Sequence, residues 1–269
     1  MNSISPVSIE EAVGLAKATA SVIRQFTGGD YGEPALGEVI TGESLAEEGL
    51  GNPVAFAHTV IDWYALSTGD LLHGTAEVSR AEHNLAFSSA AVARSACEYA
   101  QIASWLAEPG VSLEVRIARS AHLYERSVRE SRKTLSAEEF AEYESQRANS
   151  IGWARRTLSS GQRLARPTDR FKAADPVAGQ WHYSHLSDLA HGGLIAVAQT
   201  VEMARADNLE EGVLERLWKV LLPCSYTLAM VERLSKLRGR PSGILDELQL
   251  VYQNYARLLE AYETELRSR

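Results

Sequence analysis

The sequence predicts an all-α protein, a single bundle of about eight mostly antiparallel helices. Three observations predict this fold class. Capping residues recur before apolar segments, apolar residues repeat with the spacing of helix faces, and no sustained polar–apolar alternation is bounded by hairpin turns. Because no internal repeat or low-complexity tract interrupts this pattern, we expect one domain over residues 1–269.

Capping residues place the beginnings of the first five expected helices. Three of these beginnings are capping boxes, in which a serine and a glutamate three residues later bond unpaired backbone N–H groups: Ser8 with Glu11, Ser79 with Glu82, and Ser136 with Glu139. Asn52 before Pro53, and Ser112, supply the other two. The expected helices cover residues 8–25, 53 to the glycines at 69 and 74, 79–107, 112–135 and 136–161.

The last three expected helices follow a basic, proline-containing connector at 161–176, the one place where a weak domain boundary would fit. Prolines and glycines mark where these helices begin or bend. They begin after Asp175-Pro176, near Asn208 and at Pro241, with a kink expected at Gly192-Gly193 and a bend at Pro223.

Composition bounds the possible partners. The chain has 269 residues, of which 45% are hydrophobic and 23% are charged, and its formal net charge is −8 at pH 7. Phosphate binding requires a clustered basic surface, so this acidic balance disfavours nucleic acid as a partner. Cys97 and Cys224 lie far apart among apolar neighbours, and we expect both to be reduced and buried.

The sequence does not indicate a membrane protein. Its first residues lack the basic and apolar regions of a secretory signal. The long, weakly charged segment 84–107 contains Arg94, Glu98 and several serines, which would be costly in hydrocarbon. We therefore expect a cytoplasmic protein that has no membrane partner.

Two of the expected helices, about 80–107 and 177–206, carry few charged residues. A helix that is apolar on nearly every side belongs in the centre of a bundle, so we expect these two to be the most buried. Each nevertheless carries a stripe of polar side chains. Arg94 and Glu98 lie four residues apart on the first, and the second has the same spacing between successive members of its stripe: Tyr183, Ser187 and His191.

The functional interpretation is that the two stripes converge on a buried polar cavity that binds or transforms a small metabolite. Glu98 and His191 would exchange protons, because carboxylates and imidazoles are common acid–base groups in proteins. Arg94 would hold an anionic group, and Tyr183 and Ser187 would orient the ligand. The structural alternative is a buried hydrogen-bonded network that holds the helices in register.

His185 and Asp188 extend the candidate ligand-binding set, because Asp188 lies three residues from both His185 and His191. A metal site is still not expected. A di-iron bundle needs two Glu-x-x-His motifs, and the sequence contains none. His182-x-x-His185 has no second pair at a spacing that suits zinc. We therefore expect neither a metal nor a cofactor.

Two other classes of protein fit an all-helical chain of this size. A non-enzymatic interaction module would use an end helix such as 242–267 as a dimer face, so a homodimer is one assembly that the sequence allows. Isoprenoid cyclases are also all-α, but their aspartate-rich metal–diphosphate motif is missing, because Asp62 and Asp70 stand alone.

An arginine-rich helix, 113–133, has two interpretations. Its arginines alternate with glutamates, which is typical of a solvated face of salt bridges. In the alternative, Arg119 or Arg126 lines the mouth of a cavity for an acidic ligand.

The two stripes also resemble a pair of motifs in a loose group of bacterial all-helical proteins. Arg94-Ser-Ala-Cys-Glu98 is similar to their R-S-x-x-E helix, and the segment from Tyr183 to His191 is similar to their later Y-x-x-L-S-x-x-x-H helix. This resemblance covers about residues 80–205 and brings no established activity. It implies that five residues belong together: Arg94, Glu98, Tyr183, Ser187 and His191.

That group in turn resembles the small helical nucleotide-binding and RNA-cleaving HEPN domains, which implies a ribonuclease or toxin-type activity. Those domains carry an arginine four to six residues before their histidine. Here that stretch before His191 contains His185 and no arginine. RNA cleavage is therefore the alternative function, and metabolite binding is the leading one.

Overall fold

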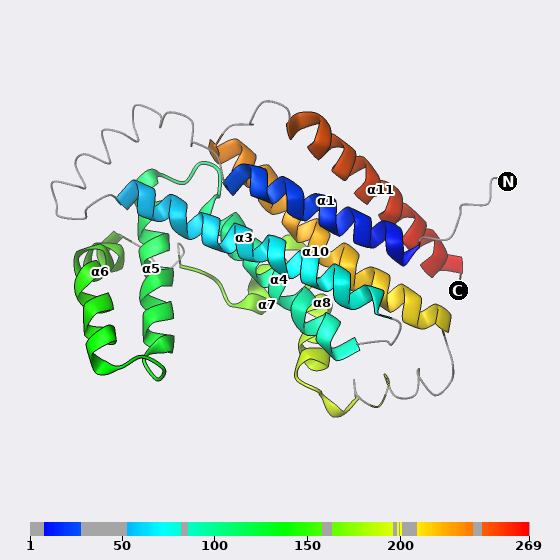
Figure 1. Ribbon diagram of the computed structural model, residues 1–269, viewed down its shortest axis with the longest axis horizontal. Helices are drawn as coiled ribbons and strands as arrows, with labels where there is room; N and C mark the ends of the chain where they lie inside the picture. The colour runs from blue at the N-terminus through cyan, green and yellow to red at the C-terminus, as the bar shows by residue number, and fades with distance from the viewer. Residues whose placement is uncertain are drawn as a thin grey trace. The chain divides into compact units, whose positions relative to one another are not determined.

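All the regular structure in the described part of the chain is helical, as the sequence predicts (Figure 1). The computed structural model describes residues 8–27, 53–81, 86–157, 163–195, 198, 200, 209–238 and 244–268. The helices within these ranges are α1 (Ile9–Thr27), α3 (Pro53–Arg80), α4 (Ala86–Leu106), α5 (Leu113–Ser131), α6 (Ala137–Thr157), α7 (Pro167–Ala174), α8 (Gly179–Ala190), α10 (Leu209–Arg238) and α11 (Ile244–Ser268).

The chain divides into two compact units, and α3 and α4 contribute to both. Unit 1 comprises Met1–Gly29, Tyr64–Ser104 and Ala165–Arg269, and unit 2 comprises Asp30–Trp63 and Trp105–Leu164. One division falls between Leu164 and Ala165, inside the connector where the sequence allows a boundary. The expectation of one domain over 1–269 stays a prediction.

Capping side chains begin three of the helices where the sequence places them. The backbone N–H of Glu11 donates to Ser8 Oγ over 3.1 Å, and the Ser8 N–H donates back to Glu11 over 3.3 Å. The N–H of Glu139 donates to Ser136 Oγ over 3.2 Å, and the Ser136 N–H donates back over 2.8 Å. Ser112 caps α5. These motifs are predictable because every partner lies within one turn.

The expected end of the second helix at its glycines is wrong, because α3 continues through both glycines to Arg80. A Cβ on Gly69 would lie 3.5 Å from Cδ1 of Ile23, an ordinary van der Waals distance, so α3 packs against α1 at this position. Packing against α1 thus outweighs the roughly 1 kcal/mol that a glycine costs inside a helix. Ser79 consequently lies within α3 instead of capping the next helix, and its expected partner Glu82 lies outside the described residues.

The connector at 161–176 contains a helix, α7, that the sequence interpretation omits. Pro167 stands at its start, where a fixed φ favours the helix, and Phe171 is fully buried. Asp175 then accepts hydrogen bonds from the N–H groups of Val177 and Ala178. A Cβ on Gly179 would collide with the carbonyl oxygen of Phe171, so α7 and α8 meet backbone to backbone.

The expected helix over 177–206 is interrupted at its two glycines, where the sequence predicts a kink: α8 ends at Ala190, and the described residues 194, 195, 198 and 200 are again helical. Gly192 has a φ of 65°, and its N–H donates to Leu189 O over 3.2 Å. The N–H of Gly193 donates to Asp188 O over 2.8 Å. Together these bonds form a Schellman motif, which stops a helix.

The two helices expected to be central differ in burial. In α4 the alanines at 90, 93, 96, 100 and 103 are fully buried, as predicted. By contrast, α8 buries only Gly179, Leu186 and Leu189, and the two residues after its glycines, Leu194 and Ile195, are 84% and 75% exposed. The expectation that this second helix is central is therefore wrong.

Both cysteines are free and buried, as expected, and burial raises the pKa of Cys224 to about 12. In unit 1, α1 packs against α10 and α11 (Figure 1). No helix of the described ranges combines the length and the apolar composition of a membrane span.

The arginines of α5, in unit 2, fall into two sets. Arg126 and Glu130 form an exposed ion pair, as a solvated face predicts, whereas the exposed Arg129 pairs with Glu125, whose side chain is only 11% exposed. Arg116 and Arg119 are only 5% exposed, so the expectation of a wholly solvated face is wrong for this pair. Their guanidinium groups donate to the carbonyl oxygens of Leu106 and Trp105 at the C-terminal end of α4.

Candidate functional site

The candidate site in unit 1 centres on Arg94 of α4. The Nε of Arg94 donates to Oε1 of Glu98 over 2.8 Å, one helical turn away, as the four-residue spacing predicts. The side chains of Arg94 and Glu98 are 18% and 21% exposed. Both side chains are thus partly buried, on a helix whose fully buried residues are mostly alanines. The pair faces α8.

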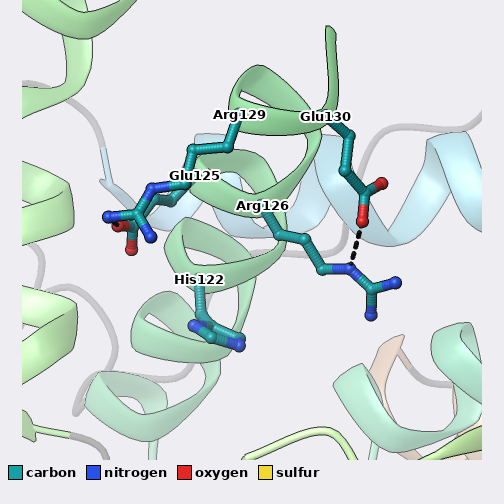
Figure 2. A pocket seen from close by; sticks show the side chains of 5 residues that line it. All are labelled: His122, Glu125, Arg126, Arg129 and Glu130. Carbon is teal, nitrogen blue, oxygen red and sulfur yellow. Dashed lines mark hydrogen bonds and ion pairs between the residues drawn. The ribbon is translucent and has the colours of Figure 1, made fainter. Parts of the chain in front are cut away.

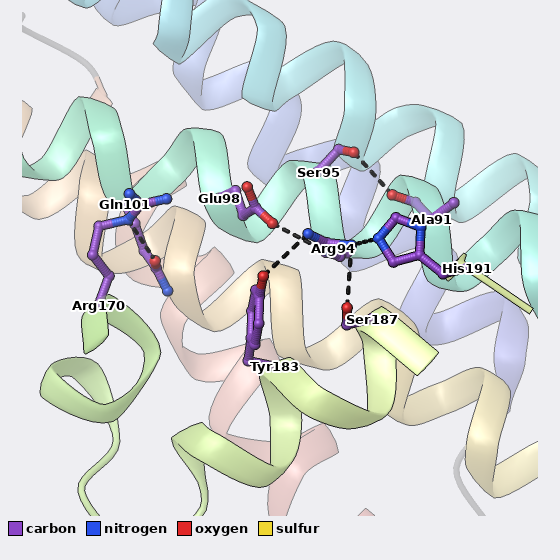
Figure 3. A network of polar contacts seen from close by, with 9 residues as sticks. All are labelled: Ala91, Arg94, Ser95, Glu98, Gln101, Arg170, Tyr183, Ser187 and His191. Atoms are coloured by element: carbon purple, nitrogen blue, oxygen red, sulfur yellow. Dashed lines mark hydrogen bonds and ion pairs between the residues drawn. The ribbon is translucent and has the colours of Figure 1, made fainter. Parts of the chain in front are cut away.

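The polar stripe of α8 meets this pair directly (Figure 3). Nη1 of Arg94 lies 2.8 Å from Nε2 of His191 and 3.4 Å from Oγ of Ser187. Nη2 donates to the hydroxyl of Tyr183 over 3.2 Å. One guanidinium group is therefore shared by four side chains, and the five residues that the resemblance grouped lie together. We call these five residues the Arg94 cluster.

The contacts fix several hydrogen positions in the cluster. An arginine nitrogen can only donate, so Nε2 of His191 is the acceptor in this contact. The oxygens of Tyr183 and Ser187 also accept from Arg94, which leaves their own hydroxyl hydrogens to donate elsewhere. Among the contacts described, Glu98 uses only one carboxylate oxygen.

The cluster is more open than the expected buried cavity. His191 is exposed, and Tyr183 and Ser187 are only partly buried. This follows from the end of α8, because His191 is the C-cap residue of a helix that stops at once. The imidazole therefore lies at the solvent side of the Arg94 guanidinium.

Aromatic packing holds Tyr183 in place. The ring of Phe171 from α7 lies 5.4 Å from the Tyr183 ring and 5.1 Å from the ring of Tyr226 on α10. The guanidinium carbon of Arg94 lies 5.1 Å from the centre of the Tyr183 ring, within cation–π range. A second bond, from Nε of Arg170 to Gln101 over 3.2 Å, ties α7 to α4 (Figure 3).

His185 and Asp188, the other two expected ligand-binding residues, lie apart from the cluster. The imidazole of His185 stacks on Trp181 with 5.0 Å between ring centres and 7° between planes, and Trp218 lies 5.3 Å away. Asp188 is exposed, and its backbone oxygen accepts from Gly193 in the motif that ends α8. The spacing along α8 explains this division, because residues 183, 187 and 191 face α4 while 181 and 185 face α10.

A buried lysine that the sequence interpretation omits lies beside His185. Lys219 of α10 has no exposed side-chain surface, and its Nζ is 2.8 Å from Glu215 and 3.1 Å from the carbonyl oxygen of Ala86. Burial lowers the pKa of Lys219, whereas Glu215 raises it. A lysine within the apolar run Leu217–Leu222, four residues after a glutamate, was the available signal. Its ammonium group ties α10 to the beginning of α4, the helix that carries Arg94.

Within the described ranges, no group of three or more histidine, cysteine, aspartate or glutamate side chains is placed to hold a metal ion. The expected absence of metal and cofactor stays a prediction. Comparisons with protein-family models, with curated proteins and with solved structures found no match to this chain. The function is therefore inferred from the side chains and their contacts.

Proposed function

We propose that the Arg94 cluster binds a small anionic metabolite, and transforms it by acid–base chemistry without a metal. The observation that carries this proposal is the sharing of one guanidinium group by four side chains from two helices. Three of these partners, His191, Ser187 and Tyr183, are neutral acceptors. A carboxylate or phosphate oxygen is a stronger acceptor for an arginine, because a charge-assisted hydrogen bond is roughly twice as strong as a neutral one.

Binding would begin with an exchange of partners at Arg94. A ligand oxyanion takes the Nη1 and Nη2 hydrogens, while Glu98 keeps the Nε hydrogen. The exchange frees Nε2 of His191, which then has an unshared lone pair beside the bound ligand. The position of His191 at the exposed side of the cluster gives a ligand access to this step.

The remaining groups supply complementary chemistry. Nε2 of His191 accepts a proton from the ligand as a general base, and the imidazolium so formed returns that proton to another atom of the ligand. The second oxygen of Glu98, on the other side of the guanidinium, is the alternative group that accepts and then returns the proton. Tyr183 and Ser187 donate their hydroxyl hydrogens and orient the ligand. Such positioned acid–base groups typically contribute about 10²- to 10⁴-fold to a rate.

The test measures ligand-dependent stabilisation of the full chain against a panel of small carboxylates and phosphate monoesters. A ligand present at about 100 times its Kd should stabilise the fold by about 2.7 kcal/mol. We expect Glu98→Gln and His191→Ala to weaken this stabilisation, and Arg267→Gln, an exposed pair partner on α11, to leave it unchanged. The absence of any stabilising acid, or equal responses in all three variants, would contradict the proposal.

One contact favours ribonuclease activity as a second candidate. HEPN domains, which the sequence resembles, pair an arginine with their histidine, and here Arg94 from another helix lies 2.8 Å from His191. This candidate predicts that the protein cleaves a single-stranded oligoribonucleotide and that His191→Ala abolishes the cleavage. RNA that stays intact with wild-type protein would exclude this candidate and leave metabolite binding untouched.

The cytoplasmic location, the homodimer and the arrangement of the helices as one bundle stay predictions from the sequence. Sedimentation of the full chain would test the homodimer, and α11, with Leu250 and Leu266 more than half exposed, is the helix on which we expect it.

A further inference from the structure

A second polar stripe, on α5 in unit 2, lines a cavity of about 330 Å³ (Figure 2). Its residues are spaced by three or four positions, so they share one helix face: His122, Glu125, Arg126, Arg129 and Glu130. A volume of this size lies at the lower end of the range for small-molecule sites. The Arg94 cluster contributes no residue to it.

Two ion pairs flank the imidazole of His122 in this cavity. Arg126 donates to Glu130 over 2.7 Å, and Arg129 lies 2.5 Å from Glu125. Figure 2 shows the two pairs on opposite sides of His122. Arg126 and Arg129 pair with glutamate side chains. The buried Arg116 and Arg119 on the same helix instead donate to backbone carbonyl oxygens at the end of α4. Each guanidinium group keeps hydrogens that can bind a further acceptor.

The charges around His122 are unequal. Burial lowers the pKa of the His122 imidazole, Glu125 raises it, and three arginines lower it further: Arg163, Arg126 and Arg129. With Glu130, which also lines the cavity, three guanidinium groups and two carboxylates surround this imidazole. An anion placed beside His122 would be attracted by the excess of positive charge, whereas a cation would be repelled.

We propose that this cavity is a ligand site for a small molecule that carries an oxyanion, either a carboxylate or a phosphate monoester. Arg126 and Arg129 bind the oxyanion with the hydrogens that their glutamate partners leave available, and an N–H of His122 donates a further hydrogen bond. The aliphatic stems of the arginines and glutamates cover the body of the ligand.

The site is tested by NMR of the histidine imidazoles in the full chain. Three probes are used, each of which contains a phenyl ring. Phenyl phosphate and benzoate carry the two oxyanions, and benzyl alcohol carries no charge. We expect phenyl phosphate, benzoate or both to perturb the signals of His122 and to raise its pKa, because a nearby anion favours the imidazolium. A response to phenyl phosphate alone would identify the ligand as a phosphate ester, and an equal response to benzoate would include carboxylates.

Matched variants test whether the charge of Arg126 binds the oxyanion. Arg126→Gln should weaken binding by at least tenfold, the effect of losing one hydrogen bond between charged groups. Arg267→Gln removes an equivalent exposed arginine, also paired with a glutamate four positions away, and should leave the affinity unchanged. Because Arg126 is 59% exposed, its replacement should leave the fold intact, which circular dichroism checks.

Three results would overturn the proposal. One is an equal response of His122 to benzyl alcohol, which would show that charge is not recognised. Another is an equal loss of affinity in Arg126→Gln and Arg267→Gln, which would indicate unspecific attraction. The third is a response confined to His191, which would place the probes at the Arg94 cluster and leave the α5 cavity without a ligand.

Discussion

Arg94 in unit 1 and Arg116 in unit 2 are both arginines on helices with buried faces, but they bind different kinds of acceptor. Arg116 is 5% exposed and donates to backbone carbonyl oxygens, including that of Leu106 over 3.1 Å. Arg119 beside it donates to the carbonyl oxygen of Trp105 and to Glu108. Arg94 donates to a carboxylate and to three neutral side chains.

The difference separates a structural arginine from a candidate functional one. The last carbonyl groups of a helix have no partner within the helix, so Arg116 completes an end of α4 that would otherwise lack hydrogen bonds. Backbone carbonyls cannot titrate and cannot leave. The partners of Arg94 are side chains, which can change rotamer or protonation state and give up their place to a ligand. The kind of acceptor is therefore more informative than burial or bond count.

The largest effect that would sharpen this comparison is expected for Arg116→Met. The change leaves buried carbonyl oxygens of α4 without a donor, and we expect it to lower the free energy of unfolding by about 3 kcal/mol. Urea unfolding of the full chain measures the loss. Arg94→Met should lower it by clearly less, because its partners can turn to water. Equal losses in the two variants would remove the distinction between the two arginines.

An intermediate effect on the free energy of unfolding is expected from the two imidazoles of α8 that lie near α10. This effect depends on pH. Burial lowers the pKa of His185 and of His182, so both are lower in the folded chain than the value of about 6.5 in the unfolded chain. Below that pH the unfolded chain binds more protons. The stability is therefore complete above pH 6.5 and is lost as the pH falls toward the folded pKa values.

Chemical unfolding between about pH 8 and pH 5 tests this dependence. His185→Asn should make the stability less dependent on pH. An unchanged slope in His185→Asn would show that the packing between the tryptophans has no energetic consequence for its protonation.

A smaller effect is expected from the partners of Arg94. Glu98→Gln and His191→Ala should each change the free energy of unfolding by at most about 1 kcal/mol, because partly exposed pairs contribute little. Ligand-dependent stabilisation should be lost in the same variants. A loss of about 3–5 kcal/mol in either variant would instead indicate a structural network whose partner is stranded.

The smallest effect is expected for Arg126→Gln on α5. An exposed pair with a four-residue spacing contributes about 0.3–0.5 kcal/mol, and we expect a loss of this size in urea unfolding. A much larger loss would place Arg126 with Arg116 as a structural residue, and would contradict its assignment to a ligand site.

Local signals in the sequence predicted those features whose partners lie within a turn. The capping boxes at Ser8 and Ser136 and the pair of Arg94 with Glu98 are of this kind. The glycines of α3 were interpreted wrongly, whereas those after α8 interrupt the helix where the sequence predicts a kink. Gly69 remains helical because α1 packs against it, and Gly192 ends a helix because its left-handed φ completes a local motif. A glycine is compatible with both outcomes, so tertiary contacts decide.

The candidate site shows the same limit. Spacing along α8 correctly put Tyr183, Ser187 and His191 on one face, but could not tell which neighbour the face would meet. His185 lies outside that stripe, and α10 supplies the tryptophan that packs on it. The pair of Lys219 and Glu215 has a four-residue spacing that predicts the ion pair, but this spacing does not show that α10 buries the lysine or that the carbonyl oxygen of Ala86 accepts from it.

The contact of α7 with α8 at Gly179 has a mechanical consequence. Since no side chain separates the two backbones there, we expect α7 and α8 to move together. The two helices are hydrogen-bonded to α4 at two residues, Arg94 and Gln101, which lie about two helical turns apart. A ligand that draws Tyr183 away from Arg94 would therefore also strain the hydrogen bond between Arg170 and Gln101. Backbone amides of α7 and α8 should then exchange their hydrogens together, and slow together when the site is filled.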